Sequence, residues 1–209
     1  MKLFNEYRNN LVFLLFLIVV FSCVNDKETI YKVCECTANA QENIKSEGGV
    51  VALSRDGYKI ISIKYGYLTP CVDLPLEYQT EGQIILFSGH LISTCYKEHS
   101  GTGLRSLYVE VNDLKKSDTL FQNGPLTITT IHTEDYGKAP GFGYIVNDTK
   151  KNFKIIQDQI PGSTKMETFK TKEDALKIAF IVAYRLENFK DFPSVYLGDL
   201  WFLKIIEII

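Results

Sequence analysis

One stretch of the chain decides the fold: Thr171-Lys-Glu-Asp-Ala-Leu-Lys-Ile-Ala-Phe-Ile-Val-Ala-Tyr-Arg-Leu-Glu-Asn-Phe189. Its apolar residues recur at spacings of four and three, which predicts one face of an α-helix: Ala175, Ala179, Val182, Leu186 and Phe189. Three further apolar residues widen this face, so we expect the helix to be largely covered: Ile178, Phe180 and Ile181. The Thr171 hydroxyl can cap the first turn, where acidic residues suit the positive end of the helix.

The residues around this helix predict a small antiparallel sheet. Strands are expected at Leu126–His132, Phe142–Val146 and Phe153–Gln157, and the last two form a hairpin. Pro193 ends the helical pattern, and an apolar segment or short helix is expected at Leu197–Ile209. The sequence therefore predicts a sheet-plus-helix domain over residues 125–209, after a polar boundary around residues 115–124.

The preceding block, residues 29–118, is predicted to be β-rich. Short apolar runs indicate strands at Thr29–Cys36, Val50–Ser54, Tyr58–Tyr65, Gln83–Cys95 and Arg105–Val111. Asp56-Gly57 favours a hairpin turn, and Gly89 is expected at a bulge or bend. Thr37–Gly49 is polar and predicted to be a loop, while Thr69-Pro70-Cys71 and Leu74-Pro75 interrupt the pattern. The expected fold class is α+β, with a small all-β domain, an OB-like barrel or a sandwich, before the sheet-plus-helix domain.

The second block also resembles a known family in the order of its motifs. These motifs are Gly143-Tyr144-Ile145, Ile155–Gly162, Phe169–Ala175 and Pro193. They match the layout of the domain of unknown function 4907, although Phe192-Pro193 stands where that family has Pro-Pro. The resemblance implies a small α+β lipoprotein domain, and it carries no assigned activity.

Residues 1–22 are predicted to be a lipoprotein signal peptide. Lys2 and Arg8 give a positive start, and Leu11–Phe21 is an apolar run of eleven residues. A membrane-spanning helix needs about 20 such residues, whereas the apolar core of a signal peptide has roughly 7–15. An uncleaved anchor helix or a buried core helix is the alternative. The run ends in Val20-Phe21-Ser22-Cys23, which resembles a lipobox and implies cleavage before Cys23 and acylation of its thiol.

Acylated Cys23 would anchor the chain to a lipid membrane. Residues 23–28 then form the lipidated cysteine and a short polar tether. Val24 stands where an aspartate would signal retention in the inner membrane, so the expected location is the cell envelope at the outer membrane. The periplasmic face and the cell surface both remain open.

Charge and cysteine content narrow the class of protein further. Residues 1–22 carry Lys2, Arg8 and Glu6, so their removal changes the formal net charge from −2 to −3. No basic stripe is present for nucleic-acid binding. The four cysteines that remain after Cys23 are expected to form disulfides in an exported protein: Cys34, Cys36, Cys71 and Cys95. We favour pairing of Cys34 and Cys36 with different partners among Cys71 and Cys95, and a Cys71–Cys95 bond is the alternative.

No catalytic residue, metal site or cofactor is predicted. His90 and His99 flank Cys95, but their spacing fits no standard zinc site, and His132 stands apart. Tyr65, Tyr67 and Tyr78 could line a glycan or peptide groove or could simply pack. The leading hypothesis is a lipid-anchored, non-catalytic binding or accessory module with an envelope protein or glycan partner. The alternative is an envelope enzyme or a thiol-redox or metal protein that uses the four cysteines.

Overall fold

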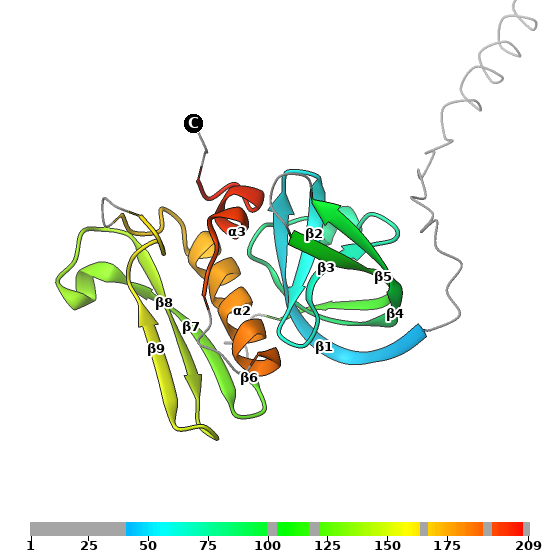
Figure 1. The fold of residues 1–209 in the computed structure, drawn as a ribbon, viewed down its shortest axis with the longest axis horizontal. Coiled ribbons are helices and arrows are strands. Elements are labelled where there is room, and N and C mark those ends of the chain that lie inside the picture. Colours follow the sequence, from blue (N-terminus) through cyan, green and yellow to red (C-terminus); the bar gives the residue numbers. More distant parts are fainter. Residues whose placement is uncertain (1–40, 100–103, 118–121, 164–166, 190–193, 207–209) are drawn as a thin grey trace, which may run out of the picture. The chain divides into compact units, whose positions relative to one another are not determined.

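The computed structural model describes residues 41–99, 104–117, 122–163, 167–189 and 194–206, which form a β-barrel and a second sheet with two helices (Figure 1). All of them belong to one compact unit. The predicted signal peptide, Cys23 and the tether lie outside these ranges. The predicted domain limits therefore stay predictions. No helix of the described residues is long and apolar enough to cross a membrane.

The first half is a closed barrel of five strands in the order β1-β2-β3-β5-β4. The strands are β1 (Gln41–Ser54), β2 (Gly57–Ser62), β3 (Gly66–Pro70), β4 (Ile84–His99) and β5 (Leu104–Lys116). β3 and β5 are parallel, and the other neighbours are antiparallel. A short 3-10 helix, η1 (Leu76–Tyr78), precedes β4. This architecture confirms the β-rich first half and selects the OB-like barrel over the sandwich.

The second half is an antiparallel sheet of four strands in the order β6-β7-β8-β9. The strands are β6 (Gln122–Asn123), β7 (Leu126–His132), β8 (Phe142–Asp148) and β9 (Phe153–Gln157), and the 3-10 helix η2 (Thr133–Tyr136) follows β7. The helices are α2 (Lys172–Asn188) and α3 (Leu197–Phe202). The sheet-plus-helix prediction is therefore confirmed, and so is the α+β class of the whole.

Helix α2 packs between the second sheet and the outside of the barrel (Figure 1). It contacts β7 and β8 on one side and β1, β2 and β3 on the other. Every residue from Ala175 through Ala183 is buried. Apart from Lys177, this segment is apolar on all sides and needs cover on all sides, which this chain supplies from two sheets.

The barrel strands next to α2 are buried on both faces, which explains their unbroken apolar runs. Val51 and Ile60 point into the barrel interior, together with Leu68, Ile85, Phe87 and Val109. Their neighbours Val50 and Ile61 belong instead to the core that contains α2. Because successive strand residues face opposite sides, a strand between two cores needs apolar residues at every position.

Two sequence predictions in the barrel are wrong. The polar stretch predicted as a loop contains the first nine residues of β1, where Ile44 is buried and a bulge lies between Ile44 and Glu47. Strand β3 was missed because Pro70 ends it and Thr69 is polar. Both strands are required by barrel closure, since β1 bridges β2 and β4 while β3 bridges β2 and β5. Barrel closure depends on contacts between residues far apart in the sequence, so the local pattern of polar and apolar residues does not predict these strands.

Local signals of turns and caps are confirmed. The hairpin between β1 and β2 pairs Ser54 with Gly57, and Gly57 has the positive φ of 105° that this turn requires. The register of β4 against β5 shifts at Gly89, whose missing side chain leaves room for the Glu110 backbone. The Thr171 hydroxyl accepts a hydrogen bond from the Asp174 N–H at 3.1 Å and so caps α2.

Replacement of Phe180 by alanine tests whether both halves depend on α2. The Phe180 ring is fully buried, and truncation of such a ring costs about 3–5 kcal/mol. We expect the free energy of unfolding to fall by that amount, with the barrel and second sheet unfolding together at a lower urea concentration. NMR signals of Ile60 and Ile128 report the two halves. The control Phe153→Ala, in half-buried β9, should cost less. An unchanged barrel midpoint in Phe180→Ala would contradict the account.

Candidate functional site

A line of four polar side chains crosses the barrel beside α3. Asp56 Oδ2 lies 3.0 Å from His99 Nδ1, and His99 Nε2 lies 3.0 Å from Ser106 Oγ. Ser106 Oγ continues to Thr69 Oγ1 at 2.6 Å. Asp56 is itself held in the β1–β2 turn, where its Oδ1 accepts a hydrogen bond from the Ser54 hydroxyl at 2.8 Å and lies 3.6 Å from Lys59 Nζ.

The distances resemble those of an Asp-His-Ser catalytic array, but the burial does not suit catalysis. Ser106 is 0% exposed, and His99 is 6% exposed beneath the Phe202 ring, whose centroid lies 4.2 Å from that of His99. A nucleophile must meet the substrate at bonding distance, and this hydroxyl is enclosed. The array therefore joins β2, β3, β4 and β5 to α3 as a structural network.

The barrel face over β2 and β3 is occupied by the chain's own helices. In OB-type barrels this face and its adjoining loops bind oligonucleotides or oligosaccharides. Here Ile61, Ile63 and Tyr67 are buried in the core that contains α2. The β1–β2 turn next to this face is hydrogen-bonded to α3. The Arg55 N–H donates to the Phe202 carbonyl at 3.1 Å, and the Arg55 side chain donates to the Trp201 carbonyl at 3.0 Å.

Ion pairs at both ends of α2, each with one buried member, link the helix to other elements. Lys177 Nζ lies 2.7 Å from Asp174 and also contacts Glu81 in the loop before β4. Near the other end of α2, Arg185 Nη1 lies 2.8 Å from the fully buried Asp199 of α3. Asp199 also accepts a hydrogen bond from the Tyr67 hydroxyl at 2.9 Å. Burial, together with the Asp199 charge, raises the pKa of Tyr67 well above its usual value, so this phenol stays neutral.

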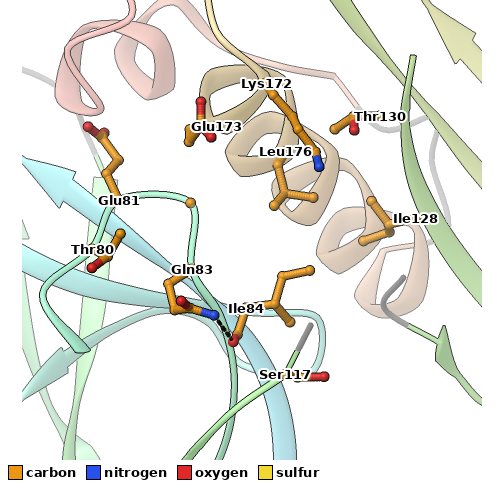
Figure 2. A pocket seen from close by; sticks show the side chains of 11 residues that line it. Thr80, Glu81, Gln83, Ile84, Ser117, Ile128, Thr130, Lys172, Glu173 and Leu176 are labelled. Atoms are coloured by element: carbon orange, nitrogen blue, oxygen red, sulfur yellow. Dashed lines mark hydrogen bonds between the residues drawn. The ribbon is translucent and has the colours of Figure 1, made fainter. Parts of the chain in front are cut away.

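The joint between barrel and helix leaves an open cleft of about 350 Å³, which we call the helix cleft (Figure 2). It is lined by Thr80, Glu81, Gly82, Gln83, Ile84, Ser117, Ile128, Thr130, Lys172, Glu173 and Leu176. Figure 2 shows Lys172 reaching from α2 toward Thr130, with Thr80 and Gln83 across the cleft.

The helix cleft combines an apolar floor with a polar rim. Ile84, Ile128 and Leu176 supply apolar surface from three different elements. Hydroxyl, amide, ammonium and carboxylate groups surround them and offer both donors and acceptors. The volume falls within the range of small-molecule sites, about 300–1,000 Å³. This arrangement suits a ligand with an apolar part that contacts the floor and a polar group that binds the rim.

A second cleft of about 400 Å³ runs along the outer part of β5, and we call it the edge cleft. One wall consists of Glu110–Leu114 of β5, and the other consists of Val72–Pro75 with Tyr78. The Tyr78 hydroxyl donates to the Leu114 carbonyl at 2.8 Å and closes one end. Asp73, Glu110 and Asp113 give the cleft an acidic rim.

The predicted site residues are only partly described. Cys23, Cys34 and Cys36 lie outside the described residues. Cys71 follows β3 and is 7% exposed. Cys95 belongs to β4, and its side chain is not described. Lipidation and disulfide pairing therefore stay predictions.

The histidines and tyrosines occupy very different environments. His90 lies in β4 with a buried Nδ1 that has no hydrogen-bond partner among the described residues, and His132 is exposed at the end of β7. Of the three tyrosines, Tyr67 is buried in the core, Tyr65 binds Lys64 and Glu42 at the surface, and Tyr78 lines a cleft. Among the described side chains, no cluster of three or more His, Cys, Asp or Glu could hold a metal ion.

Sequence reasoning missed the Asp56–His99–Ser106 network and both clefts. Asp56 was noted only as a turn residue and His99 only as a possible metal ligand. The three positions are 43 and 7 residues apart, and only barrel closure brings them together. Each of the three residues lies in a polar stretch, Arg55-Asp56-Gly57, Lys97-Glu98-His99 or Arg105-Ser106, so no local pattern of the sequence singles it out.

Comparison with known protein families shows that residues 135–196 match the family described as Domain of unknown function (DUF4907). The match runs from η2 through β8, β9 and α2. It confirms the resemblance of the second block and gives no activity. No curated protein and no solved structure is significantly similar to the chain.

Replacement of Ser106 by alanine distinguishes a structural network from a reactive serine. The change deprives His99 and Thr69 of a buried partner, so we expect the free energy of unfolding to fall by about 1–3 kcal/mol. The control Ser194→Ala, at an exposed position, should cost far less. The wild-type protein should also resist a fluorophosphonate probe, as measured by intact mass. Stoichiometric labelling of Ser106 would contradict the structural role.

Proposed function

We propose that this protein is a lipid-anchored, non-catalytic accessory protein of the cell envelope that binds an envelope partner in the helix cleft. The observation that carries the proposal is that α2 covers the outer face of strands β2 and β3. The usual ligand face of such a barrel is used for internal packing. Ligand binding is thereby left to clefts formed at the joints between elements.

Membrane attachment through Cys23 is supported by the order of its sequence features. A positive start, an apolar run of eleven residues and Ser22-Cys23 follow each other as in lipoprotein precursors. Several acyl chains on one residue hold a protein firmly at a bilayer. The described residues then lie beyond a short tether, at the outer membrane in our proposal.

Replacement of Cys23 by alanine tests the anchor directly. Cells are grown with an alkyne-bearing fatty acid, and the protein is recovered and coupled to a fluorophore. We expect the wild-type chain to be labelled and found with outer membranes, and the Cys23→Ala chain to carry no label. Asn25→Ala, two residues further on, should be labelled like the wild type. Equal labelling of the Cys23→Ala chain would refute acylation at this site.

Partner binding in the helix cleft is supported by its shape and chemistry. An apolar floor provides contact area, while the Lys172 ammonium and the Thr80 and Thr130 hydroxyls can orient a polar group. The walls are held by Lys177 and its ion pairs, so the cleft is preformed. A preformed site loses less conformational entropy on binding. An envelope protein segment or a glycan fits this description.

A charge reversal at Lys172 tests this binding site. A photo-crosslinking amino acid at position 80 should give a reproducible adduct in intact cells, identified by mass spectrometry as protein or glycan. Lys172→Glu should reduce that adduct at least tenfold because it places a carboxylate in the cleft. Lys170→Glu makes the same charge change at an exposed residue outside the lining and should leave it intact. Equal yields in the two variants, or no adduct at all, would count against the proposal.

A further inference from the structure

Strand β5 runs past the end of its neighbour β3, which leaves one of its edges open. β3 pairs with β5 only at Leu107–Val109, and the Cys71 N–H adds one hydrogen bond to the Val109 carbonyl at 2.9 Å. Beyond Val109, the ladders of the described residues join β5 to β4 alone. The edge cleft lies along this stretch, between Glu110–Leu114 and the opposite wall at Val72–Pro75.

The open edge presents backbone groups to a further strand. The Val109 carbonyl points toward β3, because it accepts a hydrogen bond from the residue that follows β3, and strand alternation turns the backbone of Val111 to the same side. The Leu114 carbonyl points there too, since it accepts a hydrogen bond from the Tyr78 hydroxyl at 2.8 Å. Among the described residues, no backbone hydrogen bond crosses the cleft from Glu110–Leu114 to the opposite wall. An edge of this kind can pair with an extended segment of another chain.

The charge around the edge cleft is acidic. The described residues that line it include Asp73, Glu110 and Asp113 but no lysine or arginine. All three acidic side chains belong to exposed residues. Lys115 Nζ lies 3.8 Å from an Asp113 oxygen, but both side chains are more than half exposed, and such surface pairs are weak. Basic side chains of a bound segment therefore complement this rim.

Apolar side chains lie beside the same edge. Val111 and Leu114 are half-buried and pack against the core inside the barrel, to which buried Leu74 contributes from the opposite wall. Val72 is 41% exposed, and Leu76 on η1 is 80% exposed. The cleft thus offers apolar contact area as well as backbone groups and charge.

We propose that the edge cleft binds an extended segment of a partner protein, in which basic and apolar side chains alternate, as an added strand beside β5. Because Val111 and Leu114 face the barrel core, their neighbours Glu110 and Asp113 face outward. The apolar side chains of the segment then contact the inward-facing pair, and its basic side chains lie beside the two carboxylates. Backbone pairing supplies affinity, and the alternating side chains supply specificity. The edge cleft shares no lining residue with the helix cleft, and its binding does not depend on acylation of Cys23.

Two model peptides test this proposal on the full chain, purified in an uncharged detergent. They have the sequences Lys-Val-Arg-Val-Lys and Glu-Val-Glu-Val-Glu with blocked ends, and NMR titration measures their affinities. We expect the basic peptide to bind at least tenfold more tightly. N-methylation of its internal amides removes their N–H donors and should weaken binding at least tenfold. No detectable binding, equal affinity for the two peptides, or no effect of methylation would overturn the proposal.

Hydrogen exchange and charge reversals locate the binding site. The Val111 amide should exchange rapidly in the free protein and at least tenfold more slowly with the basic peptide bound. Glu110→Lys should weaken binding at least tenfold, and Asp113→Lys tests the same rim if that variant does not fold. Glu134→Lys, the same charge change at an exposed residue of η2, should bind like the wild type. Slow exchange at Val111 in the free protein would mean that the edge is already paired and would refute the proposal, as would equal binding by the rim and control variants.

Discussion

Burial of α2 on all sides is the constraint on which the rest of the structure depends. Nine successive residues from Ala175 to Ala183 are buried, and no single sheet can cover a helix in that way. Each large side chain removed from water contributes about 1.5–3 kcal/mol before entropy. The second sheet covers one side of the helix, and the barrel covers the other side. Strands β1 and β2 are apolar on both faces, because one face packs on the helix and the other faces the barrel interior. The core around α2 is therefore built from both halves, while the barrel interior forms a second core from the first half alone.

This packing also determines what the barrel can do. The face over β2 and β3 packs against α2, and His99 and Ser106 of the polar line are buried beneath or beside Phe202, while Asp56 stays partly exposed. An Asp-His-Ser arrangement in an open site could be catalytic, but here the three side chains serve as hydrogen-bond partners for one another. The polar side chains that a ligand could reach lie in the two clefts, where Lys172 borders the helix cleft and Tyr78 borders the edge cleft.

The sequence predicted elements whose signals are local. The Thr171 cap, the Asp56-Gly57 turn, the Gly89 bulge and strands β7 and β9 follow from neighbouring residues and agree with the structure. The start of β1 and all of β3 were missed because barrel closure overrides their polar residues and Pro70. The ion pair between Arg185 and Asp199 and both clefts depend on tertiary placement. No spacing in one sequence reports such contacts.

Native-state hydrogen exchange tests most directly whether α2 unites the two halves. The free energy of opening is measured for the Ile60 amide in β2, the Ala179 amide in α2 and the Val146 amide in β8, across increasing low concentrations of denaturant. Two-sided burial predicts that the three amides converge on one global opening reaction. If Ile60 remains protected while Ala179 and Val146 exchange through a cheaper common opening, the barrel is stable without the helix and the account is contradicted.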